Sequence, residues 1–230
     1  AYCIIPSVRG PLRSRPLDEI RAETERLAQA GYREIVVTGI HLTSYGLDLD
    51  GSATLADALE CIHCVDGVER IRMGSLEPTV VTDEFIARLR AMPKICRHFM
   101  LALQSGSDTV LARMGRKYDT AQYLQAVEKI RAAWPDAAFQ TDVMTGFPGE
   151  TDEEFAQTKA FLKRVGYARI HVFPYSEREG TRAAVMPGSV PKAVREARAG
   201  ELIALGREME REYIARFVGR TEQVLFEQPC

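Results

Sequence analysis

Residues 138–173 read AFQTDVMTGFPGETDEEFAQTKAFLKRVGYARIHVF, and this stretch decides the fold. It begins with a strand pattern, Ala138–Met144, and continues through a glycine-rich loop into a segment with the period of a helix. Thr151 and Glu154 have the spacing of a capping box, which places the start of that helix. A second strand pattern, Arg169–Phe173, follows. Strand, helix and strand in this order predict a βαβ unit with parallel strands.

The same alternation of strand and helix patterns extends toward the N-terminus. We expect four further strands, at Tyr2–Pro6, Glu34–Thr38 (with the composition of a buried strand), Arg70–Met73 and His98–Leu103. The helices between them are expected to start near Pro16, Leu55, Thr82 and Thr120, the last two with threonine caps. Six units of this kind predict an α/β fold with a parallel sheet covered by helices. A closed TIM barrel has eight units, so six predict a partial (β/α)6 barrel.

The C-terminal part of the chain has a different pattern. A proline-bounded linker is followed by a long charged segment that predicts a helix over about Lys192–Arg216. Residues Phe217–Phe226 then alternate in polarity like the start of a new β segment. We therefore expect a core barrel over residues 1–190, a C-terminal helix of that core over 191–216, and the beginning of a further β domain over 217–230.

Composition limits the classes of function. The 230 residues are 46% hydrophobic, and 30 Lys and Arg stand against 32 Asp and Glu. The net charge of −2 gives no global basic footprint for nucleic acid, although a local patch is compatible with it. No apolar run is long enough to span a membrane. Five cysteines, an odd number, favour reduced cytosolic thiols or metal ligands over a disulfide framework.

Polar, glycine-rich loops follow five of the expected strands. Active sites of parallel α/β barrels lie at the carboxyl ends of the strands, where these loops would gather. Any one loop could be an ordinary turn, since Gly and Ser are common turn residues. Five such loops at one end of the sheet indicate a functional site. They are residues 38–46, 74–78, 103–108, 145–151 and 174–181.

Several of these stretches resemble a known family. The N-terminal decapeptide AYCIIPSVRG, the strings QSGSD, LARMGRKY, TDVMTGFPGET and HVFPYSEREGT, and the loop TGIHLTSYG are similar to motifs of radical S-adenosylmethionine (SAM) methylthiotransferases. The TGIHLTSYG loop, residues 38–46, is most similar to the branch acting on threonylcarbamoyl-adenosine of tRNA. Ser7 and Ala102 depart from the family pattern, and neither is expected to be a ligand.

The resemblance implies an activity and a set of cofactors. Family members insert sulfur and a methyl group at a C–H carbon, here of threonylcarbamoyl-adenosine next to the anticodon, using SAM and a [4Fe–4S] cluster. Cys3 would be the third thiolate of a CxxxCxxC cluster motif that begins before residue 1. A second, auxiliary [4Fe–4S] cluster is expected in an N-terminal domain, and the β segment after Phe217 would start an RNA-binding TRAM domain. The expected partners are tRNA and an electron donor such as flavodoxin or ferredoxin, in the cytoplasm and without a membrane.

The resemblance also assigns the cofactor-binding residues. Gly39 would meet the methionine amine, Glu77 and Gln104 would face SAM, Arg116 would pair with its carboxylate, and Asp142 would accept from the ribose hydroxyls. The residues expected to wall the adenine are Gly146, Phe147, Gly149, Phe173 and Tyr175. Two alternatives stay open: Phe173 and Tyr175 as barrel core, and Arg116 and Asp142 as members of a buried ion pair.

Other interpretations of the whole chain also remain. The sister branches acting on isopentenyl-adenosine of tRNA or on a ribosomal protein are one alternative, and a SAM- or RNA-binding module inactive as this fragment is another. A metal-free barrel lyase would need a lysine or metal triad at the mouth, and the sequence offers none. The CxxC of Cys61 and Cys64 lies on a predicted helix away from the strand ends, so we expect no functional role. Cys96 and Cys230 have no evident partner, and His171 is expected to be a packed barrel residue.

Overall fold

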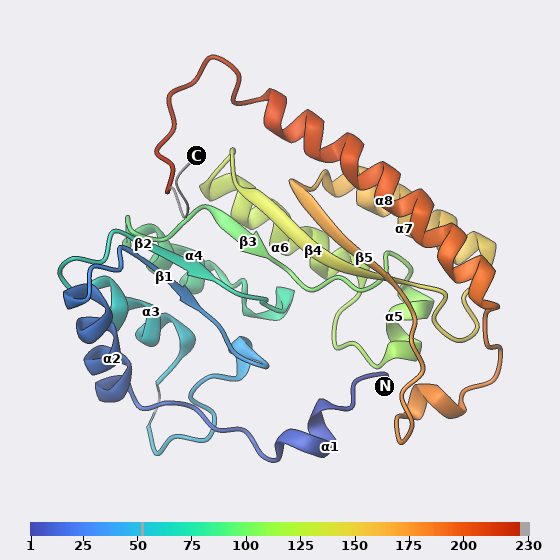
Figure 1. Ribbon diagram of the computed structural model, residues 1–230, viewed down its shortest axis with the longest axis horizontal. Helices are drawn as coiled ribbons and strands as arrows, with labels where there is room; N and C mark the ends of the chain where they lie inside the picture. Colours follow the sequence, from blue (N-terminus) through green and yellow to red (C-terminus); the bar gives the residue numbers. More distant parts are fainter. Residues whose placement is uncertain (52, 226–230) are drawn as a thin grey trace.

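The computed structural model describes residues 1–51 and 53–225 and contains parallel strands in two sheets (Figure 1). One sheet pairs β1 (Glu34–Val37) with β2 (Arg70–Met73). The other has the order β3 (His98–Met100), β4 (Ala138–Thr145) and β5 (Arg169–Pro174). Isolated bridges, Ile71 to Ile95 and Leu76 to Leu101, connect the edges of the two sheets. The described part of the chain is therefore an α/β fold with parallel sheets and no closed barrel.

Helices surround these sheets. In chain order they are α1 (Ile5–Arg9), α2 (Leu17–Gln29), α3 (Leu55–His63), α4 (Asp83–Arg90), α5 (Asp108–Met114), α6 (Thr120–Ala133), α7 (Asp152–Val165) and α8 (Lys192–Ala215). Three 3₁₀ turns lie in the connections: η1 (Leu42–Ser44), η2 (Pro78–Val80) and η3 (Arg182–Val185). None of the helices in the described residues is long and apolar enough to cross a membrane.

The capping chemistry predicted for the helices is mostly confirmed. Thr82 accepts from the Phe85 backbone N–H at 3.1 Å, and Thr151 forms the expected capping box with Glu154. The cap of α6 is not Thr120 but Asp119. Its carboxylate accepts from the Gln122 N–H at 2.7 Å while the Gln122 side chain accepts from the Asp119 N–H at 3.1 Å. This reciprocal pair satisfies two free N–H groups at once, so the helix starts one residue earlier than predicted.

The prediction of a first strand at Tyr2–Pro6 is wrong. The chain forms α1 from Ile5, with Pro6 in the first turn, where its fixed φ and missing N–H suit a helix. The N-terminus is held by other contacts: the Ala1 ammonium donates to the Met114 carbonyl at 2.9 Å, and the Ala183 N–H donates to the Ala1 carbonyl at 3.0 Å. The described fold therefore has five strands instead of six.

Two further expectations differ from the structure. The EIVVT run forms β1, but Val36 is 45% exposed, because β1 pairs only with β2 and one of its faces is uncovered. The predicted β segment Phe217–Phe226 is not a strand over residues 217–225, and Phe226 lies outside the described residues, as does Cys230. The helix expected over Lys192–Arg216 is α8.

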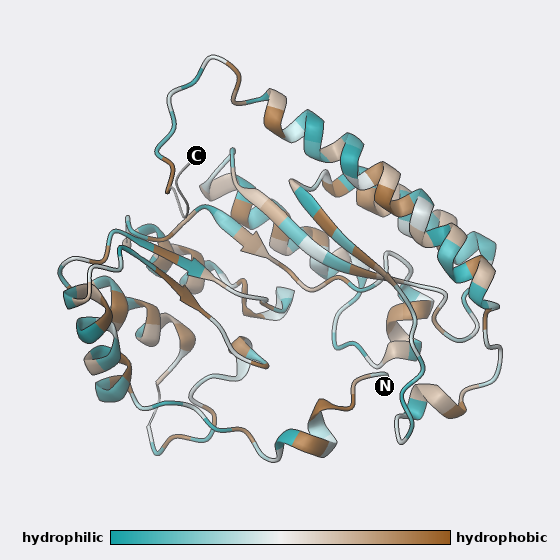
Figure 2. Cartoon of the chain, in the orientation of Figure 1, coloured by the Kyte–Doolittle hydropathy of each residue, from teal (hydrophilic) through white to brown (hydrophobic). Residues whose placement is uncertain are grey.

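The strands have one apolar and one polar face. On β4, Phe139, Thr141 and Val143 are buried, whereas Gln140 and Asp142 are half-buried. On β5, Ile170 packs on α8 so closely that a Cβ at Gly206 would lie 2.6 Å from its Cγ1. By the alternation of side chains along a strand, Arg169, His171 and Phe173 are on the opposite face, and the ribbon of β5 accordingly alternates in hydropathy (Figure 2). We call this uncovered polar face of the sheets the inner face.

The apolar core lies on the other side of the strands. Its fully buried members include Leu59 of α3, Ile71 of β2, Phe99 of β3, Phe139 of β4 and Leu202 of α8. Burial of this helix-facing surface provides the main driving force for folding. The helices therefore bury one face of each strand and leave the inner face and the loops at the strand ends for function.

Candidate functional site

Arg116 is the centre of a polar cluster at the carboxyl ends of the strands. It follows α5, and its Nη1 lies 3.2 Å from Glu77 Oε1, in the loop after β2. Its Nη2 donates to the Tyr2 hydroxyl, and its guanidinium carbon is 5.7 Å from the centroid of the Tyr2 ring and 5.9 Å from that of Tyr118. The side chains of Arg116 and Glu77 are each 19% exposed. Three segments far apart in sequence therefore meet at one guanidinium.

The protonation states in this cluster follow from the contacts. Burial acts to lower the pKa of Arg116, but Tyr118, Tyr2 and Glu77 outweigh it, and the pKa lies above its usual value. Burial raises the pKa of Tyr2, and the neighbouring Arg116 only partly offsets this. The guanidinium is thus charged and the phenol neutral at pH 7. The alternative of a buried ion pair applies to Arg116, whose partner is Glu77 and not Asp142.

The loop after β1 is attached to the same cluster. His41 Nε2 lies 3.4 Å from Glu77 Oε2, and its Nδ1 contacts the Ser44 hydroxyl. The Glu77 N–H donates to Thr43 Oγ1 at 3.1 Å. Gly39, which follows β1, fits closely against this loop, because a Cβ there would lie 3.2 Å from Leu42 Cδ2 and the leucine side chain would have to shift. The loop 38–46 is therefore connected to Glu77 by two side chains.

Gln104 has an unusual conformation beside this cluster. It is the only non-glycine residue with positive φ in the described residues, at +71°. Its N–H donates to the Asp142 carbonyl at 2.9 Å, and its own carbonyl accepts from the Met144 N–H at 2.9 Å. Its side-chain Oε1 is buried without a hydrogen-bond partner. Strained backbone and an unpaired buried acceptor are both costly, and such features concentrate at functional sites.

Asp142 lies on the inner face of β4, opposite His171 in the register with β5. Burial raises the pKa of Asp142, and the nearby His171 partly counteracts this. The described residues contain no ion pair of Asp142. His171 is exposed on the inner face, so the expectation that it is packed in the barrel is wrong.

The glycine-rich loop after β4 is held by α8. The Gly146 N–H donates to Glu150 Oε2 at 2.7 Å, and Glu150 is paired with Arg198 of α8. Gly146 has a φ of +70°, and a Cβ there would lie 2.0 Å from Arg195 Cγ. The Gly149 N–H donates to the Gly188 carbonyl at 2.7 Å. The sequence gives no signal for this connection, since α8 follows the loop by more than forty residues.

The aromatic residues predicted to wall an adenine divide into two groups. Phe147 is fully buried and packs edge-on against Tyr175, with ring centroids 5.6 Å apart. Tyr175 is 6% exposed, which favours the barrel-core alternative for that residue, and Phe147 is buried with it although it was expected only at the adenine. Phe173 is 38% exposed on the inner face and is free to contact a ligand.

The cysteines differ in their surroundings. Cys3 is exposed next to Tyr2 and offers one sulfur at the strand ends, and no three His, Cys, Asp or Glu side chains of the described residues come together as a metal site. Cys61 of α3 donates its thiol to the Leu17 carbonyl of α2 at 3.4 Å, and burial raises its pKa. The Cys61–Cys64 pair therefore belongs to the outer helices and not to the strand ends.

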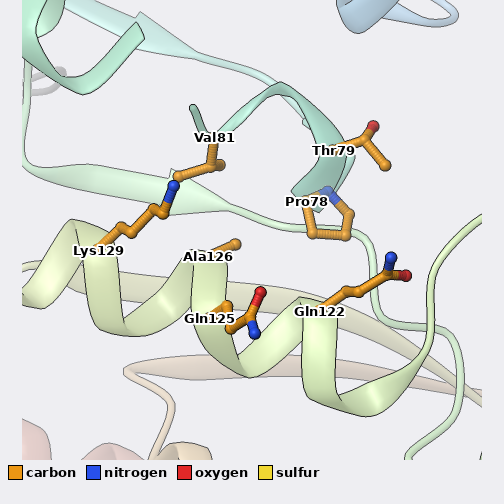
Figure 3. Close-up of a pocket in the computed structure, with 7 residues that line it drawn as sticks. All are labelled: Pro78, Thr79, Val81, Gln122, Gln125, Ala126 and Lys129. Carbon is orange, nitrogen blue, oxygen red and sulfur yellow. The ribbon is translucent and has the colours of Figure 1, made fainter. Parts of the chain in front are cut away.

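A hollow of about 270 Å³ lies between η2 and α6 (Figure 3). It is lined by Pro78, Thr79, Val81, Gln122, Gln125, Ala126 and Lys129. Lys129 is its one charged lining residue, and it pairs with Asp83 at 2.8 Å. No group in this lining has the chemistry of the Arg116 cluster, so the candidate site is the cluster.

The cluster suits a ligand that combines an amino acid with a nucleoside. Glu77 can accept from an ammonium group, Arg116 can bind a carboxylate with its planar fork, and the free Oε1 of Gln104 can accept a further donor. Asp142 can accept from hydroxyl groups, and Phe173 offers an aromatic surface. These groups match those of a SAM molecule, and the exposed sulfur of Cys3 follows Tyr2 of the cluster.

Comparison with known proteins agrees with this chemistry. The profile of the Radical SAM superfamily matches residues 1–162. The chain is 41% identical over 226 residues to "tRNA-2-methylthio-N(6)-dimethylallyladenosine synthase" of Thermoanaerobacter sp. (strain X514), covering 98% of the chain and 48% of the relative. It is also 41% identical over 227 residues to "Threonylcarbamoyladenosine tRNA methylthiotransferase MtaB" of Bacillus subtilis (strain 168), covering 99% of the chain and 50% of the relative. The chain thus spans about half the length of these relatives.

Solved structures share the fold at low sequence identity. Coproporphyrinogen III oxidase (HemN) from Escherichia coli, described as a radical SAM enzyme, superposes with a TM-score of 0.64 at 15% identity, over 84% of this chain and 45% of that one. HydG, a maturase of the [FeFe]-hydrogenase, superposes with a TM-score of 0.59 at 17% identity, over 92% of this chain and 46% of that one. Homologues in this superfamily use SAM and a [4Fe–4S] cluster. With the profile matched over residues 1–162 and the Arg116 cluster at the strand ends, the chain belongs to the radical SAM superfamily.

Proposed function

We propose that this chain is the catalytic core of a tRNA methylthiotransferase that acts on threonylcarbamoyl-adenosine next to the anticodon. The observation that carries the reaction class is the identity of about 40% to tRNA methylthiotransferases over nearly the whole chain. Relatives named for dimethylallyladenosine and relatives named for threonylcarbamoyladenosine match the chain equally well. The substrate is therefore proposed from the TGIHLTSYG loop, whose His41 and Thr43 contact the Glu77 region.

In this proposal the strand-end residues hold SAM. Glu77 would accept from the methionine ammonium, and Arg116 would exchange part of its contact with Glu77 for the methionine carboxylate. Asp142 would accept from the ribose hydroxyls, with Gly39 and Gln104 closing the site from the ends of β1 and β3. Phe173 and the loop Gly146–Gly149 would face the adenine, and the buried Phe147 and Tyr175 would support that loop from behind.

Cys3 would provide one thiolate of the [4Fe–4S] cluster, with the other two from sequence outside these 230 residues. The cluster and SAM supply one-electron chemistry, which an unactivated C–H bond requires because no general base removes its proton. The contribution of the chain is to position the cofactor and to exclude water. The half-buried Arg116 cluster would serve both purposes.

The remaining features are proposed for the whole protein. Residues 1–190 would form the core barrel, residues 191–216 its last helix, and residues 217–230 the start of a TRAM domain that binds tRNA. An auxiliary [4Fe–4S] cluster would lie in a separate domain, and flavodoxin or ferredoxin would supply electrons in the cytoplasm. The near-neutral charge of the chain supports the idea that tRNA is bound mainly by other parts of the protein, since phosphate contacts need basic side chains.

Mass spectrometry of tRNA from a deletion strain tests the function. We expect the 2-methylthio form of threonylcarbamoyl-adenosine to disappear and the isopentenyl series to remain. Loss of the isopentenyl product instead would place the chain in the sister branch, which the relative from Thermoanaerobacter equally supports. An unchanged tRNA profile, together with loss of a modification on a ribosomal protein, would remove tRNA as the substrate.

A further inference from the structure

Three side chains form a hydrogen-bonded row across the inner face of β3, β4 and β5. His98 Nε2 lies 2.9 Å from Gln140 Oε1, and Gln140 Nε2 lies 2.5 Å from His171 Nε2. The row is open to solvent: His171 is exposed, and His98 and Gln140 are half-buried. Nothing in the SAM site described above uses it. We call these three residues the inner-face row.

The amide of Gln140 gives the row a direction. Its oxygen accepts, so His98 donates through Nε2–H, and its nitrogen donates, so His171 accepts at Nε2. With Nε2 of His171 accepting from the Gln140 amide, Nδ1 is the ring nitrogen left to donate. The row therefore presents a hydrogen-bond donor at its β5 end.

Positive charge gathers beside the row. Glu34 is shared by two arginines of β2, at 2.8 Å from Arg70 Nε and 3.5 Å from Arg72 Nε. One carboxylate between two guanidiniums leaves one positive charge uncompensated. The Glu34 side chain is only 8% exposed, whereas that of Arg72 is 41% exposed, so the excess charge faces solvent.

Two further observations add to this charge. Arg169 is exposed on the same face and pairs with Gln140 in the strand register, and the described residues contain no ion pair of Arg169. The pKa of His98 is lowered mainly by burial; Arg72 adds to the lowering and Glu34 acts against it, which places both side chains within electrostatic range of the row. The inner face thus carries local positive charge although the chain as a whole is at −2.

The row lies next to the candidate SAM site. Asp142 occupies the next inner-face position on β4 after Gln140, about 7 Å along the strand at 3.3 Å per residue. The Asp142 carbonyl also accepts from the Gln104 N–H at 2.9 Å. A base placed against SAM at the strand ends could therefore extend a substituent along the inner face to the row.

We propose that the inner-face row, with Arg72 and Arg169, binds a carboxylate-bearing substituent on the substrate base. The inference rests on the proposed function and deepens it by assigning the recognition of the threonyl carboxylate. Guanidinium and imidazole donors form charge-assisted hydrogen bonds with a carboxylate. An apolar isopentenyl group would displace water from the same donors without replacing its hydrogen bonds, and polar groups buried in this way lower affinity.

Binding of matched RNAs to the full-length protein, loaded with its cluster and SAM, tests the proposal. Three anticodon stem-loops would differ only at the reactive adenosine: threonylcarbamoyl, its methyl ester, or isopentenyl. We expect the free carboxylate to bind about 10- to 100-fold tighter than the ester, the range for one or two charge-assisted bonds. Arg72→Gln and His171→Leu should each bring this ratio toward one and leave affinity for the ester unchanged.

Arg97→Gln is the matched control. Arg97 stands directly before β3 and pairs with Asp136 at 3.2 Å, with a side chain that is 60% exposed. This variant should keep the carboxylate-to-ester ratio of the unmodified protein. Unchanged SAM affinity in all three variants would show that they remain folded.

The outcomes separate the inference from the proposed function. If the threonylcarbamoyl RNA is thiomethylated but neither Arg72→Gln nor His171→Leu changes the ratio, the row and Arg72 do not bind the carboxylate and the function stands. If the isopentenyl RNA binds best and is the one modified, the inference is overturned together with the substrate branch. If none of the RNAs is thiomethylated, the proposed function itself fails.

Discussion

Glu150 and Arg198 form an almost fully buried ion pair, with Oε2 and Nη1 2.6 Å apart and side chains 1% and 7% exposed. The same Glu150 oxygen accepts from the Gly146 N–H at 2.7 Å. Arg198 also pairs with Asp152, the first residue of α7, with Nη2 and Oδ1 2.7 Å apart. One arginine of α8 therefore holds both the glycine-rich loop after β4 and the helix that follows it.

Breaking this pair should destabilise the fold strongly. We expect Arg198→Met to lower the free energy of unfolding by about 3–5 kcal/mol, because Glu150 is left buried without a counter-charge. The double variant Glu150→Gln/Arg198→Met should lose less. Urea denaturation of the single and the double variant measures the difference.

Glu201→Gln, which removes an exposed pair with Lys159, is the control and should change the free energy of unfolding by less than about 1 kcal/mol. Equal losses in the single and double variants would contradict the assignment.

Gln104→Gly should separate stability from binding. Glycine tolerates the φ of +71° and removes the unpaired buried oxygen, so the variant should unfold at the same or a higher urea concentration. If Gln104 contacts SAM as proposed, calorimetry should show weaker SAM binding in the same protein. A variant that is destabilised and binds SAM normally would make Gln104 a structural residue.

Arg116→Ala and Asp142→Ala should each weaken SAM binding by about 10- to 150-fold, the effect of losing one charge-assisted hydrogen bond. Titration calorimetry on the folded variants is the measurement. Cys61→Ser/Cys64→Ser serves as the control, because that pair lies among the outer helices. SAM affinity that survives in both Arg116→Ala and Asp142→Ala would show that these residues only support the fold.

Acid should release a stabilising contact at Glu154. Hydrogen bonds from Arg113 lower the pKa of Glu154 from 4.5 to about 2, and its side chain is 12% exposed. A carboxyl group with a lowered folded-state pKa stabilises the protein fully above its unfolded pKa. It loses that contribution as pH falls from about 4.5 toward 2. We expect up to about 3 kcal/mol to be lost in this window, since one pKa unit corresponds to about 1.4 kcal/mol. Glu154→Gln should flatten the dependence of stability on pH there, as followed by denaturation at several pH values.

Cys3→Ala should prevent assembly of the [4Fe–4S] cluster at the strand ends in the full-length protein. The expected readouts are loss of the visible absorbance of this cluster and a corresponding drop in bound iron, because a thiolate ligand is removed. Cys96→Ala, whose half-buried thiol has its pKa raised by burial, should retain both signals. A complete cluster in Cys3→Ala would contradict the ligand assignment.

Local signals in the sequence predicted most elements of the fold. The Thr151–Glu154 capping box and the run Ala138–Met144 specify α7 and β4 through short-range chemistry, and both were confirmed. Tyr2–Pro6 was predicted as a strand because its apolar residues resemble one. Strand formation, however, depends on a paired neighbouring strand. Here Ala1, directly before this run, bonds to Met114 and Ala183, and the chain turns into α1 at Ile5.

The site was predictable in its residue types and less so in its contacts. The resemblance placed Glu77 and Arg116 near SAM, but their direct pairing depends on how β2 and α5 are arranged. His171 was predicted to be packed, because periodicity alone does not distinguish the covered face of a strand from the inner face. Register decides this, and it places His171 beside Asp142. The link between α8 and the glycine-rich loop likewise depends on tertiary contacts that local patterns do not contain.

The close fit of α8 against β5 and the glycine-rich loop has a consequence for how the protein can be shortened. The superfamily profile ends at residue 162, before β5 and α8. A truncation at that point would remove β5 and leave the Glu150 carboxylate without Arg198. A truncation at residue 190 would likewise remove Arg198 and would also expose the surface of Ile170 that packs on α8 to water. The smallest version of this chain that can be produced as a stable protein should therefore extend through Ala215.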